Sequence, residues 1–167
     1  MKLYILRHGA AEAAGAGSDD GARKLSPAGR DKMRKEAAGM RALGLEFDAI
    51  LTSPLTRAVE TAEAVAQAYG GHPAPQVVAA LSAGVTPAES VGALKPFARH
   101  KSVLIVGHEP GLSGIISLLL AGSPNSLRLD LKKGALAALD LTERFERGSG
   151  NGLCWLLTPR QLRRLRS

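Results

Sequence analysis

The sequence contains one cysteine, so no disulfide can form within the chain. Cys154 lies in the apolar run LCWLL, and we therefore expect a buried structural thiol in a reducing compartment. Long hydrophobic runs are also absent, because the longest, around residues 115–122, is far too short to cross a bilayer. No charged leader precedes the first apolar segment, which Arg7 and His8 interrupt. These absences predict a cytoplasmic protein with no membrane partner.

Aromatic residues are scarce as well, at 4% of the chain, so a surface for stacking single-stranded bases has little material. The net charge of +7 would suit nucleic acid, but the basic residues are spread out, apart from the final cluster PRQLRRLRS. We interpret that cluster as a solvated helix face. If it binds a partner, we expect an acidic protein. A basic surface also suits a protein that meets phosphorylated partners. Charge alone does not decide between these functions.

Helix starts and apolar runs alternate along the chain. Ser–Pro or Thr–Pro pairs are typical of helix N-termini, where the hydroxyl caps free N–H groups and proline occupies the first turn. Between them lie short apolar runs without alternation, which are typical of strands buried on both faces. The predicted helices begin at residues 26–27, 53–54, 86–87 and 158–159, and the predicted strands cover residues 2–6, 49–51, 77–81 and 102–107.

The later part of the chain changes character. Residues 127–141 alternate at first and contain Lys132-Lys133-Gly134, which predicts an antiparallel hairpin. The stretch ERGSGNG is expected to be a mobile loop before a last strand, LCWLL, and a short basic helix. The sequence thus predicts an α/β fold of three α/β/α layers, with a mostly parallel central sheet and an antiparallel C-terminal part. We expect residues 1–167 to form a single domain.

Polar side chains follow three of the predicted strands, at the edge where parallel α/β sheets bind ligands. The first strand ends on Arg7 and His8, the second is followed by Ser53 and Arg57, and "VLIVGHEP" ends on His108. Guanidinium groups match phosphate oxygens bidentately, and helix starts offer N–H groups. The sequence therefore predicts a dianion site.

The motifs LRHGAA, LSPAGR, LTSPLTRAVETA and VGHEPGLS, in this order, resemble the histidine phosphatase superfamily, which has a phosphoglycerate mutase-like fold, over nearly the whole chain. They are most similar to its short SixA-type members, which act on phosphohistidine in proteins. The resemblance implies a cofactor-independent phosphatase in which His8 is the nucleophile and forms a covalent phosphohistidine, while Arg7, Arg57 and His108 hold the phosphoryl oxygens. Gly9 would allow close packing beside the site. No metal is implied, and the histidines have no metal-ligand spacing.

The general acid found in many members of this superfamily has no obvious counterpart here. The nearest carboxylate, Glu89, stands three residues after Thr86, a spacing that predicts a capping box. Glu109 could also donate a proton, but its place beside His108 suits a loop or helix start. An imidazole leaving group has a parent pKa of roughly 6.5 and needs less protonation than an alkoxide. The missing acid therefore favours phosphohistidine as the substrate.

Other interpretations of the sequence stay open. One is a broad phosphomonoesterase on small metabolites that uses Glu89 or Glu109 as its acid. Another is a phosphate- or nucleic-acid-binding module without turnover. Ser53 would cap the second helix whether or not it touches phosphate, and Arg23, in the Gly- and Ala-rich stretch 10–24, could help to receive a substrate. We expect a histidine-phosphorylated protein as the partner and a monomer as the assembly, with signal transduction as the setting.

Overall fold

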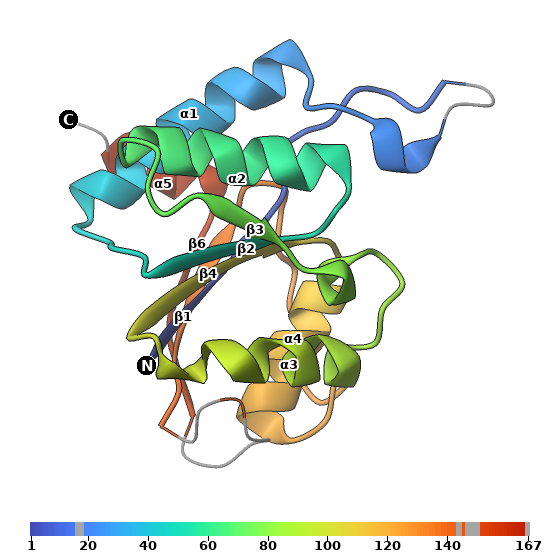
Figure 1. Ribbon diagram of the computed structural model, residues 1–167, viewed down its shortest axis with the longest axis vertical. Coiled ribbons are helices and arrows are strands. Elements are labelled where there is room, and N and C mark those ends of the chain that lie inside the picture. Colours follow the sequence, from blue (N-terminus) through green and yellow to red (C-terminus); the bar gives the residue numbers. More distant parts are fainter. Residues whose placement is uncertain (16–18, 143–144, 146–150, 166–167) are drawn as a thin grey trace.

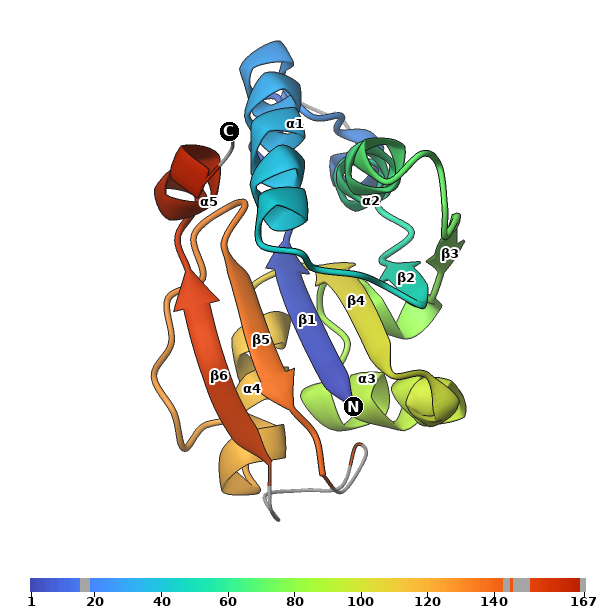
Figure 2. The same cartoon turned by 90° about the vertical axis from the view of Figure 1, so that its left-hand side faces the viewer.

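A computed structural model describes residues 1–15, 19–142, 145 and 151–165. Its strands form one six-stranded sheet in the order β3-β2-β4-β1-β5-β6 (Figures 1 and 2). The first four strands in chain order are parallel, whereas β5 runs antiparallel to both β1 and β6. The predicted fold class is therefore confirmed. The strands are β1 (Lys2–Arg7), β2 (Ala49–Thr52), β3 (Pro75–Val77), β4 (Ser102–Gly107), β5 (Leu136–Asp140) and β6 (Gly152–Leu157).

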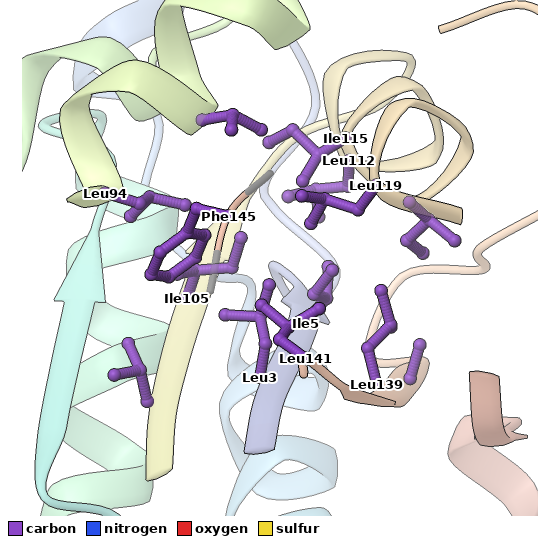
Figure 3. Close-up of a cluster of buried hydrophobic side chains, with 14 of the residues drawn as sticks. Leu3, Ile5, Leu94, Ile105, Leu112, Ile115, Leu119, Leu139, Leu141 and Phe145 are labelled. Carbon is purple, nitrogen blue, oxygen red and sulfur yellow. The ribbon is translucent and has the colours of Figure 1, made fainter. Parts of the chain in front are cut away.

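Helices cover both faces of this sheet (Figure 2). One face carries α1 (Pro27–Ala42), α2 (Thr56–Ala68) and α5 (Pro159–Leu165), and the other carries α3 (Pro87–Leu94) and α4 (Gly111–Ala121). Alternate side chains of β1 enter two different cores. Tyr4 and Leu6 pack under α1 and α2, while Leu3 and Ile5 pack towards α3 and α4 (Figure 3). None of the described helices is both long and apolar enough to span a membrane.

Three of the four predicted helix starts are confirmed. Ser26 caps α1, Thr158 accepts a hydrogen bond from the Gln161 N–H, and Thr86 forms a full capping box with Glu89. The prediction for Ser53 is wrong. Helix α2 begins at Thr56, and its N-cap residue, Leu55, makes no side-chain cap.

The predicted hairpin over residues 127–141 is also wrong. Residues 127–131 belong to no strand, because both edges of β1 are already filled by β4 and β5, and β5 pairs with β6 on its other side. A turn does form at the predicted place, with Gly134 at φ +84° and a hydrogen bond from the Ala135 N–H to the Lys132 carbonyl. The run 77–81 is not a strand over its length. β3 ends at Val77, and Ala79–Leu81 form a 3-10 turn that delivers Leu81 to the core.

Cys154 is exposed, so the predicted buried thiol is wrong. It lies on β6, an edge strand that pairs only with β5 and whose first half is uncovered. The Lys2 ammonium lies 3.4 Å from its sulfur. Of the predicted mobile loop ERGSGNG, residues 146–150 lie outside the described residues, as do residues 16–18 of the Gly- and Ala-rich stretch.

Candidate active site

The carboxyl ends of three neighbouring strands meet at one edge of the sheet. β4 lies between β2 and β1, with Arg7 opposite Gly107 and Thr52 opposite Val106. The ladder continues one residue further on both sides, because the His8 N–H donates to the Gly107 carbonyl at 3.1 Å and the Ser53 N–H donates to the Val106 carbonyl at 3.0 Å. The residues that follow the three strands are thus held by backbone hydrogen bonds next to one another.

His8 is held as a neutral imidazole with a defined tautomer. The side chain is 6% exposed, and its Nδ1 lies 2.7 Å from the Gly9 carbonyl oxygen. A carbonyl can only accept, so Nδ1 carries the proton and Nε2 keeps its lone pair. Burial, and then the charges of His108, Arg57 and Arg7, lower the pKa of His8 to about 3, against the opposing hydrogen bond to Gly9. The ring is therefore an uncharged base at neutral pH.

His108 stands beside it, with the two ring centroids 4.9 Å apart. Its Nε2 lies 2.8 Å from the Ser53 hydroxyl oxygen, which also accepts a hydrogen bond from the Leu55 N–H at 3.2 Å. Among the described residues the Ser53 hydroxyl hydrogen has no other acceptor, so it donates to Nε2, which leaves the proton of His108 on Nδ1. Burial, and then Arg57, lower the pKa of His108 to about 4. Ser53 thus orients the His108 imidazole and is not the N-cap residue of α2.

Two arginines complete the cluster, the half-buried Arg7 and the buried Arg57. Arg7 donates from Nη1 to the Leu131 carbonyl at 2.6 Å. Arg57, 5% exposed, donates from Nη1 to the Asp20 carbonyl at 2.7 Å and from Nη2 to the Asp20 carboxylate at 3.0 Å. The Arg23 side chain binds the same carboxylate and, with Arg57, lowers the pKa of Asp20. Asp20 is a residue that sequence reasoning missed.

Several buried donors in this cluster have no hydrogen-bond partner among the described residues. They are Nε of Arg7, Nε of Arg57 and Nδ1 of His108. Buried polar atoms are normally satisfied, so such a group marks a place where a ligand supplies acceptors. Two guanidinium groups and an imidazole N–H present donors suited to a tetrahedral oxyanion. No group of three His, Cys, Asp or Glu side chains able to hold a metal ion occurs in the described ranges.

The other predicted residues lie around this cluster. Gly9 packs against α1, where an added Cβ would come 2.7 Å from Met33 Cγ, and its N–H donates to the Thr61 hydroxyl. Glu89 is exposed and bound to Thr86 in its capping box. Glu109 accepts a hydrogen bond from the Ser113 hydroxyl at 2.7 Å, at the start of α4. Both carboxylates are therefore engaged at helix N-termini.

Comparisons with known proteins agree with this geometry. Residues 3–82 match the family model of the histidine phosphatase superfamily (branch 1). The chain is 34% identical to an uncharacterized protein of Picosynechococcus sp. (strain ATCC 27264 / PCC 7002 / PR-6), over 97% of this chain and 99% of that protein. The chain belongs to the histidine phosphatase superfamily. It is also 28% identical to the phosphohistidine phosphatase SixA of Escherichia coli (strain K12), over 98% of this chain and 97% of SixA.

Solved structures of the superfamily share the fold. The structure of the protein histidine phosphatase SixA complexed with tungstate has a TM-score of 0.83 and 25% identity, and the match covers 97% of this chain and 99% of SixA. A putative alpha-ribazole-5'-P phosphatase from Escherichia coli str. K-12 substr. MG1655 has a TM-score of 0.74 and 18% identity, with 95% and 97% covered. The SixA-type resemblance is therefore confirmed. Membership of the superfamily and similarity to SixA support phosphatase activity, although its members include phosphatases of small molecules.

Proposed function

We propose that the protein hydrolyses phosphohistidine on a partner protein through a covalent phosphohistidine at His8. The observation that carries this proposal is the neutral His8 ring, whose Nδ1 proton is held by the Gly9 carbonyl. Beside it lie three buried donors that have no partner within the described part of the chain. A neutral imidazole is a good nucleophile at pH 7, and fixing Nδ1 aims its reactivity through Nε2.

The reaction proceeds in two displacements at phosphorus. His8 Nε2 forms a bond to phosphorus while the N–P bond of the substrate breaks, and the departing imidazole nitrogen keeps the electron pair and takes a proton from water. A water oxygen then attacks the phosphoryl group on His8, releases inorganic phosphate and returns the lone pair to Nε2. Arg7, Arg57 and His108 Nδ1 stabilise the charge that spreads over the equatorial oxygens in both steps.

The surroundings of the site favour an N–P bond over a phosphate ester. Glu89 is tied into the capping box with Thr86, and Glu109 is bound to Ser113. Among the described residues the one buried carboxylate is that of Glu36, and it pairs with Arg163. An alkoxide leaving group needs a positioned acid, whereas an imidazole, with a parent pKa of roughly 6.5, leaves with little help. The similarity to SixA supports the same substrate class.

The test compares two substrates in the presence of EDTA. Phosphate release is followed from a histidine-phosphorylated protein and from an alkyl phosphate, with the wild-type chain, His8→Gln and the control His72→Gln, whose side chain is exposed in a loop. We expect rapid release from the phosphohistidine protein, release that is lost in His8→Gln, and wild-type rates in the control. Acid-labile label on the wild-type chain, absent from His8→Gln, would support the covalent intermediate.

Three results would overturn the proposal. Preferential release from the alkyl phosphate would indicate a phosphomonoesterase of small metabolites, with Glu109 or Glu89 as the acid. Phosphate binding without release from either substrate would indicate a binding module. His8→Gln with unchanged release would remove His8 from the reaction while leaving the superfamily assignment intact.

A further inference from the structure

A groove of about 690 Å³ lies on the α3 and α4 side of the sheet, apart from the cluster of histidines and arginines. Its walls come from three separate parts of the chain: the segment 84–87 before and at the start of α3, the first turn of α4, and the segment 124–129. Three prolines line it, Pro87, Pro110 and Pro124. Because proline fixes backbone φ, each of the three walls contains one position of restricted backbone.

Two parts of the chain link the groove to the candidate active site. A narrower cavity shares Gly84, Val85 and Gly111 with it and extends to His108. The segment that forms its other wall runs on from Arg128 to Leu131, whose carbonyl accepts the hydrogen bond from Arg7 Nη1. Three residues of fully extended chain span at most roughly 10 Å. The groove thus begins within that reach of the carbonyl that binds the Arg7 guanidinium.

The segment 127–129 is held in place by α4 and presents two unengaged side chains. The Leu127 N–H donates to the Ser117 hydroxyl at 3.0 Å, and the Leu129 carbonyl oxygen lies 3.4 Å from the Ser113 hydroxyl, whose hydrogen points mainly to Glu109. Leu127 is one of the few large exposed hydrophobic side chains, at 37%. Arg128 is exposed and makes no ion pair with any residue that the structure describes. An apolar contact point and a free positive charge therefore stand side by side on the rim.

We propose that this groove binds the polypeptide that flanks the phosphohistidine, with an apolar side chain against Leu127 and an acidic side chain at Arg128. The inference rests on the proposed function, and it adds where the protein substrate is recognised. A groove of this volume is several times larger than an imidazole ring and falls in the range of roughly 300–1,000 Å³ of sites that enclose whole ligands. Flanking residues of a phosphoprotein would fill it, whereas the phosphoramidate group alone would not reach it.

The test separates recognition of the protein from chemistry at phosphorus. Leu127→Ser and Arg128→Glu are compared with matched controls, Leu153→Ser on the edge strand β6 (44% exposed) and Arg164→Glu on α5 (exposed). Each variant is assayed on a histidine-phosphorylated protein and on phosphoramidate. We expect kcat/KM on the protein to fall roughly tenfold in the two groove variants, equivalent to about 1.4 kcal/mol, through a higher KM. On phosphoramidate, all four variants should stay within about twofold of wild type.

The possible failures are distinguishable. Equal effects of the groove and control variants on the protein substrate would overturn the groove as the docking site, and so would equal losses on both substrates. If the wild-type chain hydrolyses neither phosphoramidate nor the phosphoprotein, the proposed function itself is wrong.

Discussion

The buried neutral histidines make the folded chain sensitive to acid. Burial lowers the pKa of His8 from the ordinary 6.5 to about 3, and that of His108 to about 4. The unfolded chain binds these protons near pH 6.5, whereas the folded chain does not. The stability that the neutral rings contribute is therefore fully present above pH 6.5 and is lost as the pH falls towards the folded-state values.

The magnitude for His8 follows from this difference in pKa. Each pH unit between the two pKa values is worth about 1.36 kcal/mol. At pH 4 the unfolded imidazole is almost fully protonated, while the folded one, with a pKa of about 3, has only begun to titrate. His8 alone then lowers the free energy of unfolding by about 3 kcal/mol relative to pH 7. For a domain of ordinary stability, this is a large share of the total.

Urea unfolding of the wild-type chain, His8→Gln and His72→Gln, followed by circular dichroism at pH 7, 5.5 and 4, measures this effect. Glutamine does not titrate, so the loss of stability between pH 7 and pH 4 should be about 3 kcal/mol smaller in His8→Gln than in wild type. His72→Gln, which changes an exposed loop residue, should follow the wild type more closely. Parallel pH dependence of wild type and His8→Gln would refute the burial argument, and with it the reason for a neutral nucleophile.

Further predictions concern positions beside the site and beneath it. Ser53→Ala should lower kcat roughly two- to tenfold and leave KM unchanged, because a neutral hydrogen bond to His108 worth about 1 kcal/mol is lost. Steady-state rates on phosphoramidate measure both constants. Burial raises the pKa of Glu36 to about 7, so the free energy of unfolding of the wild type should fall by up to about 3 kcal/mol as the pH rises from 4.5 to 7. Urea unfolding of Glu36→Gln should show no such fall. Gly29→Ala places a Cβ against the Ala10 carbonyl, so thermal unfolding should show that the folded chain is about 1–3 kcal/mol less stable.

The strand ends of the site could be predicted from the sequence because their cause is local. A short apolar run buried on both faces, followed at once by charged or titratable side chains, forces those side chains to the sheet edge. This holds for Arg7, His8 and His108, whose strands were placed correctly. The capping box of Thr86 and Glu89 could be predicted for the same reason, since it requires only two suitable residues three positions apart.

Features set by neighbours distant in the sequence could not be predicted. Asp20 binds Arg57 from 37 residues away, and no period or motif in the sequence links the two. Ser53 precedes proline like a helix cap, but the helix begins at Thr56, and the hydroxyl meets His108, which follows β4. The alternation in residues 127–131 indicates a strand, but β1 and β6 already occupy both edges of β5, the strand with which that segment would form the hairpin. Cys154 is exposed for a related reason, because β6 is the last strand of the sheet.

The backbone hydrogen bonds at the sheet edge tie catalytic competence to global folding. The amides of His8 and Ser53 extend the central ladder onto β4, which lies between β1 and β2. Amides in such a position exchange with solvent through opening of the whole sheet rather than through local fraying. The backbone positions of His8 and Ser53 are therefore lost when this part of the sheet opens. Residual activity during heating or denaturation should report the folded fraction of the whole chain, and the slowest-exchanging amides should include those beside the nucleophile.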